Sequence, residues 1–156
     1  MQYENQDVTR IYAGSDHAGF ALRARLVAHL RGRGIEVKEL GAPTAESSDY
    51  PDWAAAVGRA VREQAGSFGL LVCGTGLGVC IAANKVHGVR AVDVWNLEGA
   101  RQSRGHNDAN VLCLGAKLVA EADAIAIVDV WLETPFEGGR HARRVAQIAA
   151  IEAQEK

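Results

Sequence analysis

A cysteine at the head of a glycine-rich loop is the part of this sequence best placed to carry chemistry. Cys73 follows a short apolar run, residues 70–72, and precedes a loop, residues 74–78, in which glycine alternates with other residues. A helix is predicted after the loop, over residues 79–85. Backbone N–H groups at the start of a helix favour an anion, and a thiol beside them can ionise and act as a nucleophile or a base.

Two plainer interpretations of this stretch remain open. A glycine-rich turn after a strand can be only a tight connection, and a buried cysteine usually behaves as a small hydrophobic residue. The loop is not a P-loop, because it lacks the GxxxxGK[ST] pattern and Lys85 lies too far along the following helix. It also differs from the dinucleotide-binding GxGxxG pattern, which normally follows the first strand, so a nucleotide-dependent redox protein is disfavoured.

Asp16 and His17 form a second polar turn, flanked by glycines, after the first predicted strand. One interpretation is structural: Asp16 caps the helix that follows, and His17 lies at the surface. The other is functional: the two side chains contact a sugar hydroxyl and a phosphate at the end of the strand.

Two further groups could bind or protonate a substrate. His106, followed by Asn107, ionises near neutral pH and is a natural proton donor, although it could equally be a polar loop residue. Arg140 and Arg144 are four residues apart and share one face of a helix, where they form either a solvated basic face or a phosphate clamp. Lys117, just past the fifth predicted strand, adds a positive charge.

Strands and helices alternate along the chain, with no tandem repeat and no linker. Strands are predicted over residues 9–13, 35–40, 70–72, 89–94 and 110–114. Helices are predicted after the turn that ends at Phe20, with Leu22, Leu26 and Leu30 on one face and a stop at Gly32 and Gly34, then after Pro51, and over residues 79–85, 97–104, 118–132 and 140–154. This order predicts an α/β fold, a three-layer α/β/α Rossmann-like doubly wound sheet of five parallel strands. Ligands bind beyond the C-terminal ends of such strands, where Asp16, His17 and Cys73 fall.

Length and composition are consistent with one globular domain spanning residues 1–156, with a polar, frayed lead-in over residues 1–8. Apolar residues make up 48% of the chain and the net charge is −2, so bulk electrostatics favour neither nucleic acid nor a membrane as a partner. Cys73, Cys80 and Cys113 form neither a CxxC pair nor a zinc pattern, so we expect reduced thiols and a cytoplasmic location.

Taken together, the motifs resemble the ribose-5-phosphate isomerase B family, which also includes the galactose-6-phosphate isomerase subunits. The resemblance runs from about residue 10 to residue 152 and rests on ordered blocks: GSDHAGF from Gly14, DYP from Asp49, CGTGLG from Cys73, IAANK from Ile81, GVRA from Gly88, SRGHNDANV from Ser103 and EGGRH from Glu137.

The resemblance implies an aldose–ketose isomerase that acts on a small sugar phosphate through an enediolate, with no metal and no cofactor. Cys73 would be the base, while Thr75 and the N–H groups of residues 74–78 would stabilise the oxyanion. His106, with Asp16 nearby, would assist ring opening. The substrate-binding residues would be Asp16, His17, Gly74, Thr75, Gly76, Leu77, Gly78, Asn107, Lys117, Arg140 and Arg144. Lys117 stands where the family often has arginine. Lysine keeps the positive charge but lacks the forked guanidinium that can bind two oxygens at once.

The resemblance also implies homodimers, or tetramers built from them, whose sites combine residues of both chains. We therefore expect the His106 region or the C-terminal arginine helix to reach into the neighbouring subunit. Trp131 and Phe136 either help to bury that contact or belong to the intrachain core. Trp95 follows the fourth strand, and its bulk favours a pentose or tetrose phosphate over a hexose phosphate. A non-catalytic sugar-phosphate-binding subunit is the main alternative function.

Overall fold

The computed structural model describes residue 8 and residues 10–155. Their centre is a five-stranded parallel sheet with the strand order β2-β1-β3-β5-β4. The strands are β1 (Arg10–Ser15), β2 (Glu36–Gly41), β3 (Ser67–Cys73), β4 (Ala91–Asp93) and β5 (Val111–Gly115). The chain winds outward from β1 to β2 and then crosses to β3 on the other side. The C-terminal ends of β1 and β3 therefore meet at the point where the winding reverses, which is where ligands bind in such sheets.

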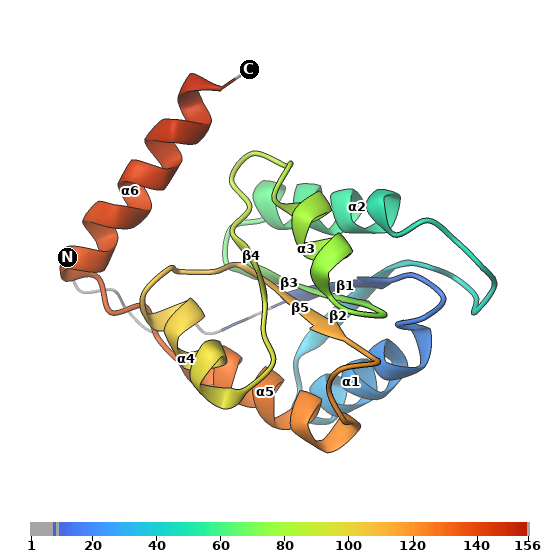
Figure 1. Ribbon diagram of the computed structural model, residues 1–156. Helices are drawn as coiled ribbons and strands as arrows, with labels where there is room; N and C mark the ends of the chain where they lie inside the picture. The colour runs from blue at the N-terminus through green and yellow to red at the C-terminus, as the bar shows by residue number, and fades with distance from the viewer. Residues whose placement is uncertain (1–7, 9, 156) are drawn as a thin grey trace.

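Helices cover both faces of the sheet, which confirms the predicted three-layer doubly wound fold (Figure 1). One face is covered by α1 (Phe20–Gly32), α4 (Leu97–Gly105) and α5 (Glu121–Glu133), and the other by α2 (Tyr50–Glu63) and α3 (Leu77–Ala83). Each pair of layers encloses its own hydrophobic cluster. The predicted stripe Leu22, Leu26 and Leu30 is buried in the first of them. None of the described helices is long and apolar enough to cross a membrane.

Trp131 belongs to the intrachain core. It is 2% exposed, and its ring meets that of Phe68 edge-on at 5.2 Å between centroids. The core alternative for this tryptophan is thus the right one. Phe136 is half-buried in the segment that leaves α5.

The last helix, α6 (Gly139–Gln154), projects away from the sheet and its covering helices (Figure 1). It buries His141, whereas Ile148 and Ile151 are 47% and 61% exposed. Near its end, the carboxylate of Glu152 accepts hydrogen bonds from the N–H of Gly88 at 2.9 and 3.1 Å. Of the predicted lead-in, residues 1–7 lie outside the described residues, and Val8 packs, partly buried, against the core.

The predicted boundaries differ from the observed ones where loops are held by specific bonds. The predicted strand over residues 89–94 shortens to β4, because Val89 closes a turn onto Val86 and the N–H of Arg90 is taken by the Asn110 side chain. The predicted helix from residue 118 begins only at Glu121. The residues before it form a turn in which the Lys117 N–H donates to the Gly74 carbonyl at 2.9 Å.

Gly19 illustrates how closely α1 approaches the sheet. A Cβ at this position would lie 2.3 Å from the Val72 carbonyl oxygen, which is backbone and cannot move aside, whereas a Cβ at Gly32 of the same helix would meet nothing within 4 Å. We expect Gly19→Ala to lower the free energy of unfolding by about 2 kcal/mol or more. Gly32→Ala should raise it by about 0.5–1 kcal/mol. Denaturant unfolding at one protein concentration measures both, and equal effects would contradict the assigned contact.

Candidate active site

The glycine-rich loop surrounds the thiol of Cys73 at the C-terminal end of β3. Cys73 is buried, and the N–H of Gly76 donates to its sulfur at 3.1 Å. Gly76 has a φ of 81°, a left-handed conformation that favours glycine, and it forms the N-cap of α3. The N–H of Leu77 lies 3.3 Å from the hydroxyl oxygen of Thr75. The predicted loop thus forms, with a backbone donor directed at the sulfur.

Asp16 and His17 lie beyond the neighbouring strand, β1. Asp16 is buried, and its carboxylate accepts the N–H of Gly19, the N-cap of α1, at 3.0 Å. The structural interpretation of Asp16, support of the following helix, is therefore realised. His17 is exposed, and its Nδ1 lies 3.3 Å from the N–H of Ser48. Because Nδ1 accepts this bond, the neutral ring carries its proton on Nε2.

Two further side chains contact the glycine loop. Lys117 lies over Gly74, where a Cβ would be 3.5 Å from its Cε and 3.7 Å from its Nζ, so the predicted charge reaches the loop. The ring of Tyr50 packs on Gly78, where a Cβ would lie 2.5 Å from Cζ and 2.9 Å from the hydroxyl. Tyr50 was absent from the predicted site residues, although it belongs to the quoted DYP block, because that block was interpreted only as the start of a helix.

A second cluster forms around His106, at the end of α4. The rings of His106 and His141 stack in parallel, with centroids 4.1 Å apart. Glu137 bridges them: its oxygens lie 3.7 Å from Nε2 of His106 and 3.5 Å from Nε2 of His141. Burial lowers the pKa of His141, and the positive charges of His106 and Arg140 act in the same direction. Glu137 and His141 were not predicted as site residues; the EGGRH block was the available signal.

The loop that carries His106 and Asn107 is held by two arginines. Arg104 is buried, and its Nη1 donates to the Asp108 carboxylate at 2.8 Å and to the Ala109 carbonyl at 2.6 Å. The guanidinium of Arg90 binds the carbonyls of Asn107 and Asp108 at 2.8–3.1 Å. Arg140 and Arg144 are exposed on the first turns of α6, near the histidine pair.

The two clusters lie at opposite ends of the parallel strands: one at the C-terminal ends and the other at the N-terminal ends. Cys73 is the last residue of β3 and lies at the C-terminal ends of the strands, as do Asp16 and His17 after β1 and Lys117 after β5. His106 and Asn107 instead precede the first residue of β5. Because the strands are parallel, the five residues of β5 separate these ends by on the order of 15 Å. A single chain therefore brings together each half of the predicted site but does not join the halves.

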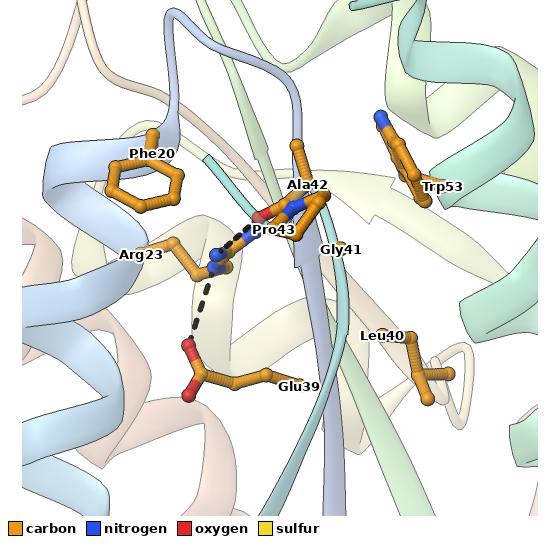
Figure 2. A pocket seen from close by; sticks show the side chains of 8 residues that line it. All are labelled: Phe20, Arg23, Glu39, Leu40, Gly41, Ala42, Pro43 and Trp53. Carbon is orange, nitrogen blue, oxygen red and sulfur yellow. Dashed lines mark hydrogen bonds and ion pairs between the residues drawn. The ribbon is translucent and has the colours of Figure 1, made fainter. Parts of the chain in front are cut away.

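A hollow beside β2 has a structural explanation. Its buried Arg23 donates to the Ala42 carbonyl at 2.7 Å and pairs with Glu39 at 3.5 Å (Figure 2). Arg23 also donates to the Ser15 hydroxyl at 2.8 Å. The guanidinium is thereby committed to holding the chain that leaves β2.

The remaining cysteines fit their predicted places, Cys80 in α3 and Cys113 in β5, and all three thiols are free.

Comparison with known proteins decides the family. The ribose/galactose isomerase family matches residues 11–148. The chain belongs to this family. Ribose-5-phosphate isomerase B of Escherichia coli K12 is 48% identical to the chain over 143 residues, which cover 92% of the chain and 96% of the relative. The predicted resemblance is thus confirmed.

Solved structures of the ribose/galactose isomerase family share the whole fold. Ribose-5-phosphate isomerase B of Clostridium thermocellum superposes with a TM-score of 0.91 at 48% identity, covering 93% of this chain and 98% of that one. The Mycoplasma genitalium enzyme, solved with bound ribulose 5-phosphate, gives a TM-score of 0.90 at 40% identity, covering 94% and 97%.

Arg104 should be indispensable to the loop that carries His106. Arg104→Ala leaves the Ala109 carbonyl without the Arg104 donor and the Asp108 carboxylate with Arg90 as its remaining cation, and we expect it to lower the free energy of unfolding by about 3 kcal/mol or more. Arg101→Ala is the matched control on the same helix; its exposed ion pair with Glu98 spans 3.7 Å, and its loss should cost about 0.5 kcal/mol or less. Denaturant unfolding compares them, and similar losses would refute the role of Arg104.

Proposed function

We propose that this chain is an aldose–ketose isomerase that interconverts ribose 5-phosphate and ribulose 5-phosphate. Membership of the ribose/galactose isomerase family supports the reaction class. The names of the relatives, and the ribulose 5-phosphate bound to the Mycoplasma genitalium enzyme, support the substrate. The observation that carries the proposal is the Cys73 thiol, held at the end of a central strand with a backbone N–H directed at its sulfur.

In the proposed reaction Cys73 acts as the base. Its thiolate removes the hydrogen on C2 of the open-chain aldose, and the electron pair moves onto the carbonyl oxygen at C1 to give an enediolate. The same proton is returned to C1 as the hydroxyl proton of C2 moves to the oxygen at C1, which leaves the ketose. Thr75 and the N–H groups of residues 74–78 stabilise the enediolate; preorganised donors of this kind contribute about 3–4 kcal/mol each.

The second half of the site comes from another copy of the chain. In the proposed homodimer, α6 packs on the partner, burying Ile148 and Ile151, and the His106 cluster of one chain faces the glycine loop of the other. His106, with Asp16 of the other chain, assists ring opening, and Asn107 contacts a sugar oxygen. The phosphate is bound by His17, Arg140 and Arg144, with Lys117 adding charge. The separation of the two clusters within one chain supports this arrangement.

Pentose and tetrose phosphates are the favoured substrates. Trp95 is 56% exposed just beyond β4, at the edge where Cys73 lies, so its bulk narrows the space for a longer sugar. Allose 6-phosphate and galactose 6-phosphate are the alternatives within the family. A panel of four- to six-carbon aldose and ketose phosphates, compared by kcat/KM, ranks them.

The three free thiols suit the proposed cytoplasmic location.

Replacing the thiol separates catalysis from binding. Cys73→Ala should lower kcat by about a thousandfold or more, because the base is lost, while sugar-phosphate binding survives. Cys80→Ala is the matched control, since this thiol lies in α3 outside the loop. Isomerase assays and titration calorimetry with ribulose 5-phosphate measure the two quantities. Loss of binding together with activity would show that the role of Cys73 is wrong, and a wild-type chain that binds but never converts sugars would favour the non-catalytic subunit.

Mixing two inactive variants tests the shared site. Cys73→Ala and His106→Ala each inactivate both sites of a homodimer, but a mixed dimer contains one site with both residues intact. Random pairing of equal amounts after co-expression should therefore restore about a quarter of the wild-type activity. If each site belonged to one chain, the mixture would stay inactive.

A further inference from the structure

Asp93, the last residue of β4, is a half-buried residue with a buried carboxyl group that the proposed mechanism does not use. Both carboxyl oxygens are inaccessible to solvent, and neither has a hydrogen-bond partner among the described residues. Its Cα pairs with that of Cys113 on β5, so its side chain lies on the sheet face that α3 covers. An ionised carboxylate without a partner is costly in such a place, and protonation is the usual outcome.

The carboxyl packs directly beneath the glycine loop. A Cβ on Gly76 would lie 2.2 Å from Oδ1 of Asp93, so the acid occupies the space that any side chain at position 76 would need. Gly76 is also the residue whose N–H donates to the Cys73 sulfur. Asp93 therefore supports, from below, the peptide that is directed at the thiol.

The groups that face Asp93 do not supply a positive charge. Cys80 of α3 and Cys113 of β5 interact with the carboxyl, and Cys113 also interacts with Cys73. The indole of Trp95 favours the carboxylate, but burial is the larger effect and raises the pKa of Asp93. A charge here would oppose ionisation of the neighbouring thiols and would repel the negative charge that the loop must stabilise in the proposed reaction.

We propose that Asp93 is a positioning residue of the isomerase: its carboxyl supports Gly76 and holds the Gly76 N–H on the Cys73 sulfur. This rests on the proposed function. The shape of the carboxyl group is needed to support Gly76, whereas a negative charge on it would repel the negative charge that the loop must stabilise in the proposed reaction. The carboxyl packs against Gly76 of the loop, so its proposed effect on the reaction passes through Gly76.

Two substitutions separate shape from charge. Asp93→Asn keeps the shape without the charge and should retain kcat within about threefold at pH 6; above the pH at which the wild-type acid ionises, it should exceed the wild-type kcat/KM by about tenfold. Asp93→Ala removes the support and should lower kcat by about tenfold or more with little change in KM. An Asp93→Asn variant as impaired as Asp93→Ala would overturn the proposal.

Thermal unfolding tests the raised pKa of Asp93 without any assay of activity. The unfolded chain loses this proton near pH 3.9, about the ordinary value for aspartate, and burial raises the pKa of Asp93 in the folded chain. Wild type therefore loses stability relative to Asp93→Asn as the pH rises between the two pKa values. The difference in Tm should widen by about 3–5 °C per pH unit across that pH window. Asp123→Asn, an exposed site on α5, is the control and should show no such trend.

A Tm difference that does not widen as the pH rises above about 4 would show that folding does not raise the pKa of Asp93 and would overturn the proposal. If the wild-type chain has no isomerase activity, the positioning role falls together with the proposed function. The widening difference in Tm would then still identify Asp93 as an acid whose pKa is raised by folding, so the two failures can be told apart.

Discussion

The hydrogen bond from the Gly76 N–H to the Cys73 sulfur depends on a chain of close contacts. Residue 76 must adopt a left-handed conformation, and it must lack a side chain because Asp93 fills the space beside it. Gly115, at the end of β5, is equally constrained, since a Cβ there would lie 2.5 Å from the Thr75 carbonyl oxygen. The loop is thus held between the ends of two strands. Such support fixes donors before a substrate arrives, which is what stabilisation of a developing anion requires.

The parallel sheet imposes a second constraint, because each loop must lie at one of its two edges, meaning here the C-terminal or the N-terminal ends of the strands. Loops after strands lie at the C-terminal edge with Cys73, and loops before strands lie at the other edge with His106. No rearrangement of side chains brings the two edges together. A site that needs both therefore needs two chains, and the projecting α6, whose first turns carry Arg140 and Arg144, is the element of the described chain best placed to link them.

The fold and the first half of the site could be predicted from the sequence because both depend on local pattern. Apolar runs and, for the second strand, alternating apolar residues located the strands. The polar turn after the first strand located Asp16, and the glycine-rich loop after the third located Cys73. The bridge from Glu137 to two stacked histidines could not be predicted, because it requires the segment after α5 to fold back onto the end of α4, where the Glu137 N–H donates to the Gly105 carbonyl at 3.0 Å. The support from Tyr50 and Asp93 was missed for a similar reason. Each of these residues packs against a glycine, Gly78 for Tyr50 and Gly76 for Asp93. Because a glycine has no side chain, the sequence gives no pattern that indicates the contact.

The buried charged residues divide by whether the fold satisfies them. Arg23 has a hydroxyl, a carbonyl and a carboxylate within reach, and Arg104 has a carboxylate, a carbonyl and the faces of Phe68 and Trp131, so both stabilise loops of the fold. The carboxyl oxygens of half-buried Asp93 have no such hydrogen-bond partner among the described residues, although they are inaccessible to solvent and lie near the thiols of Cys80 and Cys113. Folding alone would be served better by an apolar residue of the same size, because burying an unpaired acid opposes stability. The Asp93 carboxyl packs against the loop in which the Gly76 N–H donates to the Cys73 sulfur. The loss of stability therefore comes at the place where, in the proposed reaction, the local charge must be controlled.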